Sequence, residues 1–88
     1  MGLLARMLRR EAYSVSFDKA NTTFLYRERG RRIHVSGEAM ADGYAVYASS
    51  IRECEPIPAE TIDDAERQRI AINIRQYYTD RGKNVYLS

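Results

Sequence analysis

Residues that build active sites are scarce in this chain. Its 88 residues include one histidine, His34, one cysteine, Cys54, and no tryptophan. No second histidine or cysteine stands at metal-ligand spacing, and the sequence has neither a phosphate-binding glycine motif nor the G-x-S-x-G motif of a nucleophilic serine. We therefore expect no enzymatic activity, no bound metal and no cofactor.

The two isolated reactive residues have structural interpretations. His34 alternates with apolar neighbours, which predicts a strand histidine on the outer face of a sheet. A general base is the alternative, because an imidazole can transfer protons near neutral pH. Cys54 lies between Glu53 and Glu55 in a predicted acidic loop, and neighbouring carboxylates disfavour a thiolate, so it is a poor nucleophile.

Long hydrophobic runs are also missing. No segment approaches the roughly 18 to 20 apolar residues that span a bilayer, so we expect no membrane association. Residues 1–12 have the pattern of a short amphipathic helix or arm, and Arg6 interrupts its apolar patch, which makes a poor secretory signal. A lone cysteine fits a reducing compartment, and we expect the protein to be cytoplasmic.

Charge is unevenly distributed along the chain. The net charge is +2, but residues 1–52 carry +4, residues 53–66 carry −6 and residues 67–88 carry +4. The acidic segment fits a solvated loop followed by a helix N-terminus, because acidic side chains favour that end of the helix dipole. A patch for a basic partner is the alternative.

One long helix is predicted near the C-terminus. Ile70, Ile74, Tyr77 and Tyr78 recur at i, i+4, i+7 and i+8, which lines one side of a helix. This is the longest segment of the chain that follows one period. We expect Ile70 and Ile74 to be buried against a sheet.

Both ends of this helix have their own signals. Thr61 is the predicted N-cap, and Gly82 supplies a left-handed stop. Asp63 and Arg67 have the favourable i,i+4 orientation for an ion pair. These signals predict a helix over residues 63–81.

Strand patterns precede the helix. Alternating apolar and polar residues predict strands at 13–17, 22–28 and 31–40, with a turn at Arg29-Gly30. Arginine is a mediocre residue for positive φ, so a longer loop is the alternative. With a two-residue loop, the predicted cross-strand pairs are Glu28 with Arg31, Tyr26 with Ile33, and Phe24 with Val35.

A second hairpin is predicted at the Asp42-Gly43 turn signal, with Tyr44 to Ile51 as its returning strand. The residues of that strand are apolar on both faces, so the N-terminal helix or a second copy of the chain must cover the far side. We therefore expect self-association. Pro56 and Pro58 predict an extended connector to the helix.

These elements define an α+β architecture in one domain, residues 1–88. It consists of an antiparallel β-meander of about four strands, one long helix packed on one face, and a short C-terminal strand at Val85 and Leu87. A chain of this size has a marginal core, which favours association with a partner.

Candidate partner-binding residues lie on three surfaces. Four arginines crowd the hairpin tip, where they could bind phosphate or a carboxylate-rich surface. A solvated hairpin end partly neutralised by Glu28 is the alternative. The second surface is the acidic segment, with Glu53 and Glu55. The third consists of Tyr47 and Ile72, two apolar positions that fit an interface. The candidates are Arg27, Arg29, Arg31, Arg32, Tyr47, Glu53, Glu55 and Ile72.

Several short motifs from about Tyr26 onward resemble a known family. The residues that carry the resemblance are Gly37, Glu38, Met40, Tyr47, Ser49, Ser50, Ile51, Pro56, Arg67, Ile70, Asn73 and Ile74. Through them the chain is similar to the immunity-protein family numbered seventy-four of bacterial polymorphic toxin systems. Immunity proteins occlude a cognate toxin without catalysis, so the resemblance implies a toxin as protein partner.

Three functions remain open at this point. The first is a non-catalytic module that binds a protein partner, as the resemblance implies. The second is a homodimeric structural or regulatory module that pairs through the strand around Tyr47. The third and weakest is a nucleic-acid-binding module that uses the tip from Arg27 to Arg32.

Overall fold

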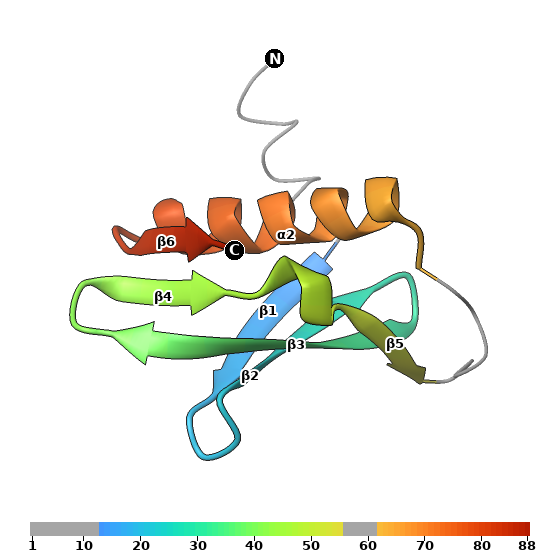
Figure 1. Ribbon diagram of the computed structural model, residues 1–88, viewed down its shortest axis with the longest axis horizontal. Helices are drawn as coiled ribbons and strands as arrows, with labels where there is room; N and C mark the ends of the chain where they lie inside the picture. The colour runs from blue at the N-terminus through green and yellow to red at the C-terminus, as the bar shows by residue number, and fades with distance from the viewer. Residues whose placement is uncertain (1–12, 56–61) are drawn as a thin grey trace.

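A mixed β-sheet with one long helix on one face forms the fold, in a computed structural model that describes residues 13–55 and 62–88 (Figure 1). The helix is α2 (Asp64–Thr79). We call the sheet face that α2 covers the inner face and the opposite one the outer face. The predicted α+β class is confirmed, whereas the predicted N-terminal helix or arm and the proline connector lie outside the described residues.

Three consecutive strands form the first half of the sheet. β1 (Tyr13–Asp18), β2 (Thr23–Glu28) and β3 (Arg31–Met40) pair with one another as antiparallel neighbours. Arg29 and Gly30 form a two-residue turn with φ of 53° and 77°, as a type I′ turn requires. The predicted hairpin register is confirmed at Glu28 with Arg31, Tyr26 with Ile33, and Phe24 with Val35.

Three shorter strands complete the sheet. β4 (Gly43–Val46) pairs antiparallel with the end of β3, and β6 (Asn84–Leu87) pairs parallel with β4. The strand order is β1-β2-β3-β4-β6, and β5 (Arg52–Glu55) pairs with β3 beside this path. The predicted closing strand at the C-terminus is thereby confirmed.

The second hairpin differs from the prediction. Its turn residues are Ala41 and Asp42, and Gly43 already belongs to β4, so the predicted Asp42-Gly43 turn is wrong by one residue. The prediction of one strand over residues 44–51 is also wrong, because β4 ends at Val46 and a 3-10 turn, η1 (Ala48–Ser50), follows.

Tertiary contacts explain this break. The Ser50 hydroxyl accepts a hydrogen bond from the backbone amide of Ser36 at 2.8 Å and donates one to the Tyr47 carbonyl at 2.6 Å. The turn redirects the chain so that Ile51 enters the core, where it is 2% exposed. Ile51 therefore does not add to an uncovered apolar face, and self-association stays a prediction that rests on Ala45 and Tyr47.

Residues 53–55 form a strand, so the prediction of an acidic loop there is wrong. β5 pairs with residues 32–34 of β3, next to the segment 37–40 that pairs with β4. Since β4 is short, the edge of β3 beyond it has free backbone groups, and β5 satisfies them.

The core lies between α2 and the inner face. Ile70 and Ile74 are fully buried, as predicted, together with Ala71 and Tyr78. Tyr78 packs against the rings of Phe24 and Tyr44, so aromatic contacts join the helix to β2 and β4. The sheet supplies the other core residues, among them Val15, Phe24, Tyr26, Ile33, Val35 and Val46.

The helix is shorter than predicted at both ends. It begins at Asp64, and its N-cap is Asp63, whose carboxylate accepts a hydrogen bond from the Glu66 amide at 2.8 Å; the prediction of Thr61 as N-cap is wrong. Because Asp63 caps the backbone, Arg67 pairs with Asp64 instead of Asp63. Gly82, at φ 79°, ends the helix as predicted, in a Schellman motif. In this motif the backbone amide of Lys83 donates to the Tyr78 carbonyl, and that of Gly82 donates to the Thr79 carbonyl.

Candidate partner-binding surface

The pleat of the strands divides the arginine-rich hairpin tip between the two faces of the sheet. Arg27 and Arg32 are cross-strand partners, and both are exposed on the outer face. Arg29 lies in the turn and is exposed as well. Arg31, in contrast, is half-buried on the inner face, beside α2. The four arginines therefore do not form one surface.

Arg31 belongs to an ion-pair cluster that attaches the hairpin tip to α2. The Glu28 side chain is 5% exposed, and Arg69 of α2 donates hydrogen bonds to its two carboxylate oxygens at 2.8 and 2.7 Å. Arg31 donates to Glu66 at 3.2 Å, and Arg69 donates to Glu66 as well. Hydrogen bonds from Arg69 lower the pKa of both Glu28 and Glu66, although partial burial opposes the shift. We call these four residues the tip cluster; they stabilise the fold.

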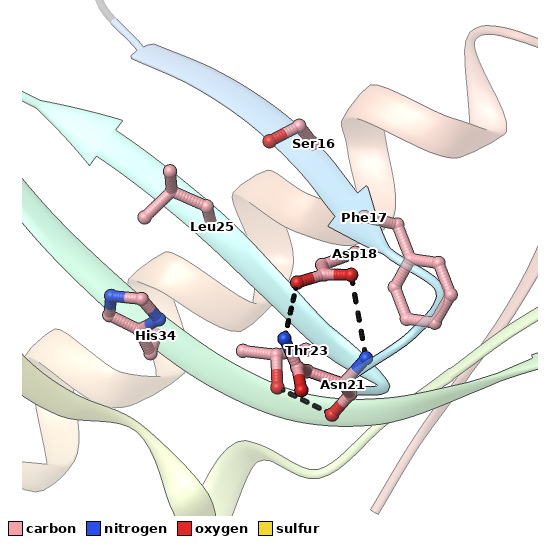
Figure 2. Close-up of a pocket in the computed structure, with 7 residues that line it drawn as sticks. All are labelled: Ser16, Phe17, Asp18, Asn21, Thr23, Leu25 and His34. Atoms are coloured by element: carbon pink, nitrogen blue, oxygen red, sulfur yellow. Dashed lines mark hydrogen bonds between the residues drawn. The ribbon is translucent and has the colours of Figure 1, made fainter.

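The outer face carries an apolar position in the middle of β2. Leu25 is half-buried, and its cross-strand neighbours are Ser16 on β1 and His34 on β3. The predicted place of His34, exposed on the outer face, is confirmed. These residues lie along a pocket of about 410 Å³ (Figure 2), which we call the Leu25 pocket. Its lining residues are Ser16, Phe17, Asp18, Asn21, Thr23, Leu25 and His34.

The β1-β2 loop closes one end of the Leu25 pocket with a charged group. The Asp18 carboxylate accepts a hydrogen bond from the Asn21 side-chain amide at 2.7 Å (Figure 2). It accepts another from the Ala20 backbone amide at 3.0 Å. The Thr23 hydroxyl donates to the Asn21 carbonyl at 2.8 Å. The bond from the Asn21 side chain is the main cause that lowers the pKa of Asp18, so this end is negatively charged at neutral pH.

A second part of the outer face extends over β3, β4 and β6. Glu38, Ala45 and Tyr86 are aligned across these strands. The Tyr86 side chain is 48% exposed, and its hydroxyl donates to Asp42 at 2.7 Å. Tyr47 follows β4 and is half-buried; desolvation and the nearby Glu38 carboxylate raise its pKa. This part therefore presents aromatic side chains next to acidic ones.

The remaining predicted site residues lie in two different places. Glu53 and Glu55 belong to β5, where they are backbone partners of Ile33 and Arg32. The first residues of the acidic segment and the last arginine of the tip, predicted as separate patches, are thus neighbours in the sheet. Ile72 is 46% exposed on α2, on the side opposite the buried stripe of the helix, and is remote from the outer face of the sheet.

Leu25 was not among the predicted site residues, and of the tip cluster only Arg31 was. The parity of β2 places Leu25 outward beside Arg27, so an apolar residue between outward polar ones was the available signal. The contact of Arg69 with Glu28 joins residues 41 positions apart, and no local pattern reveals such a pair.

Among residues 13–55 and 62–88, no three His, Cys, Asp or Glu side chains lie close enough together to hold a metal ion. Over the same ranges, no helix has the length and hydropathy needed to cross a membrane. The outer face of the sheet carries the exposed side chain of Arg27, the Leu25 pocket and the exposed ring of Tyr86.

Fold and surface together describe a small α+β fold whose sheet is covered on its inner face by α2 (Figure 1). Residues 20–88, which include every element from β2 onward, match the family described as immunity protein 74. The chain therefore belongs to that family. No curated protein and no solved structure shows significant similarity to it.

Proposed function

We propose that this protein neutralises a cognate toxin by binding it in a stoichiometric complex, with no turnover of its own. Membership of the immunity protein 74 family supports this function. The surface that we propose binds the toxin is the outer face of the sheet. In the described residues this face is opposite α2, and it holds the Leu25 pocket beside Arg27.

The other surfaces fit a docking site less well. The inner face is filled by the core, and the tip cluster uses its charged groups within the chain. The outer side of α2 presents the isolated apolar residue Ile72 among exposed polar positions. An interface needs an apolar centre with polar groups around it, and the outer face combines the two.

A titration of toxin activity tests this function. The probe is the toxin domain encoded beside the gene, produced with and without the purified protein. We expect toxin activity to fall linearly with added protein and to reach its minimum at one equivalent, because occlusion consumes one protein for each toxin. Isothermal calorimetry should give the same endpoint.

Two results would contradict the proposal. Full toxin activity in an excess of protein would remove the function altogether. Inactivation of many toxin equivalents by one equivalent of protein would instead show turnover, and the chain would be an enzyme that modifies the toxin.

A further inference from the structure

We propose that the Leu25 pocket receives a basic side chain of the toxin, a lysine or an arginine, whose stem lies against Leu25 and whose cationic group reaches the Asp18 carboxylate. This inference rests on the proposed function and names the chemistry that the outer face recognises. It commits to one polarity of partner and to one contact, at the end of the sheet where the β1-β2 loop lies.

The Leu25 pocket combines an apolar wall with a charged end. Leu25 lies between Ser16 and His34, and Asp18 and Asn21 lie at the loop end (Figure 2). A long basic side chain has the same two parts, because lysine and arginine bury their methylene stems along apolar surface and keep the charged head at a polar site. A wholly apolar side chain would instead desolvate the carboxylate without supplying a hydrogen bond to it.

The charged end of the pocket offers hydrogen-bond acceptors. The Thr23 hydroxyl donates its proton to the Asn21 carbonyl at 2.8 Å, so that its oxygen retains only lone pairs. Asp18 accepts from the backbone amides of Ala20 and Asn21 and from the Asn21 side chain, and a carboxylate has about four acceptor sites. Ammonium and guanidinium groups carry donors and no acceptor, so they match this end of the pocket.

Asp18 has no cationic partner within residues 13–55 and 62–88. Its hydrogen bonds come from neutral amides of the β1-β2 loop. The carboxylates that form ion pairs in these ranges are Glu28, Asp64 and Glu66. Lys19, the next residue along the chain, is exposed and forms no ion pair with Asp18. The negative charge at this end of the pocket is therefore available to a cation of the toxin.

Charges on the two sides of Leu25 determine how a basic side chain enters. Thr23, the cross-strand partner of Asp18, and Arg27 each lie two residues from Leu25 along β2, in opposite directions. Two residues of a strand span about 6.6 to 6.8 Å. A cation is attracted to the Asp18 end and repelled from the Arg27 end, so the bound side chain points toward Asp18.

The adjoining part of the outer face has the same polarity as Asp18. Glu38 is exposed on β3, four residues beyond His34, toward the end of the sheet where Asp18 lies. Asp42 follows in the β3-β4 turn and accepts a hydrogen bond from Tyr86. These carboxylates extend the negative charge away from the arginine tip, so a toxin segment with several basic residues gains further attraction there.

Matched substitutions test the charge contact. Asp18→Asn removes the charge and keeps an oxygen that accepts from the Ala20 amide, and Asp80→Asn makes the same change at an exposed carboxylate after α2. Binding to the toxin domain encoded beside the gene is measured by biolayer interferometry at low and high ionic strength. We expect Asp18→Asn to weaken binding by about tenfold at low salt and to reduce its salt dependence, and Asp80→Asn to change binding less than about twofold.

A second matched pair tests the pocket by filling it. Ser16→Lys places an ammonium group on the same face of β1 as Asp18, two residues away, where it can reach the carboxylate. Ser49→Lys makes the same change at an exposed serine of η1. Circular dichroism establishes that the variants fold. We expect Ser16→Lys to weaken toxin binding by more than about tenfold and Ser49→Lys to change it less than about twofold.

Changes in the toxin identify the basic residue. Its surface lysines and arginines are changed one at a time to alanine, and each variant is measured against the wild type and against Asp18→Asn. For the residue that enters the pocket, the loss of binding should be smaller with Asp18→Asn than with the wild type, because both changes remove the same contact.

Three results would contradict the inference. If Asp18→Asn and Ser16→Lys both bind like the wild type, the inferred contact is wrong while the proposed function stands. Tighter binding by Asp18→Asn would show that an acidic group of the toxin faces the pocket, which would also overturn the inference alone. If the wild type does not bind the toxin domain, the inference and the proposed function both fall.

Discussion

The two faces of the β2-β3 hairpin use the same residue type for different purposes. On the inner face, Arg31 lies in the tip cluster with Glu28, Glu66 and Arg69, and positive and negative charges alternate. On the outer face, Arg27 is opposite another arginine, and both are exposed. The contrast separates charges that are half-buried in an ion-pair cluster from charges that are exposed to solvent.

Burial explains why charged side chains on the two faces contribute differently to the stability of the fold. A carboxylate that is 5% exposed must have partners, and Glu28 has two hydrogen bonds from one guanidinium. Polar contacts continue along the same side of the helix, since Asn73 donates to the Tyr26 hydroxyl at 2.8 Å and accepts from Tyr13 at 3.1 Å. Exposed ion pairs contribute much less, so the outer face can vary with little effect on folding.

The largest effect on stability should come from Ile74, and Ile72 on the opposite side of α2 is its control. Ile74→Ala opens a cavity in a fully buried site and should lower the free energy of unfolding by about 2 to 5 kcal/mol. Ile72→Ala shortens a side chain that is exposed on the opposite side of the helix and should change the free energy of unfolding by less than about 0.5 kcal/mol. Urea denaturation measures both. Equal losses in the two variants would place the wrong side of the helix against the sheet.

A smaller effect should distinguish the carboxylates of the two faces. Glu28→Gln removes one of the two anionic partners of the Arg69 guanidinium and should lower the free energy of unfolding by about 1 to 3 kcal/mol at neutral pH. Glu38→Gln, on the exposed outer face, should cost less than about 0.5 kcal/mol. A loss in Glu38→Gln as large as that in Glu28→Gln would break the contrast between the faces.

The cost of Glu28→Gln should also depend on pH. Because Arg69 lowers the folded-state pKa of Glu28, the ionised carboxylate stabilises the fold fully above its unfolded-state pKa of about 4.3. That contribution is lost as the pH falls through the folded-state pKa. Urea titrations from neutral to acid pH should therefore show the wild type and Glu28→Gln converging below about pH 4, and a constant difference would contradict the ion pair.

The smallest effect on stability concerns the turn that joins β2 to β3. Arg29 adopts a left-handed φ of 53°, which asparagine tolerates better than arginine, so Arg29→Asn should stabilise the protein by about 0.5 to 1 kcal/mol. Gly30→Ala, at φ 77°, should act in the opposite direction. Thermal unfolding followed by circular dichroism measures both, and a loss of stability in Arg29→Asn would mean that the arginine side chain has a structural role.

The sequence by itself determined the local elements and their buried sides. Alternation in residues 23–35 predicted the hairpin register, because a shift of one residue would turn every apolar side chain to the wrong face. The spacing of Ile70, Ile74 and Tyr78 predicted the buried stripe of α2 for the same kind of reason. Gly82 predicted the end of the helix, since the left-handed conformation favours glycine. Each of these features depends on neighbours within a few residues.

Only the tertiary structure decided which groups meet across the chain. β5 fills an edge of β3 that is vacant because β4 is short, and η1 brings Ile51 into the core through a hydrogen bond between Ser50 and Ser36. Arg31 and Glu28 have their ion-pair partners, Glu66 and Arg69, more than thirty residues away. Such contacts form because distant segments supply the partners of backbone and charged groups. A pattern of neighbouring residues in the sequence cannot show which distant segment that will be.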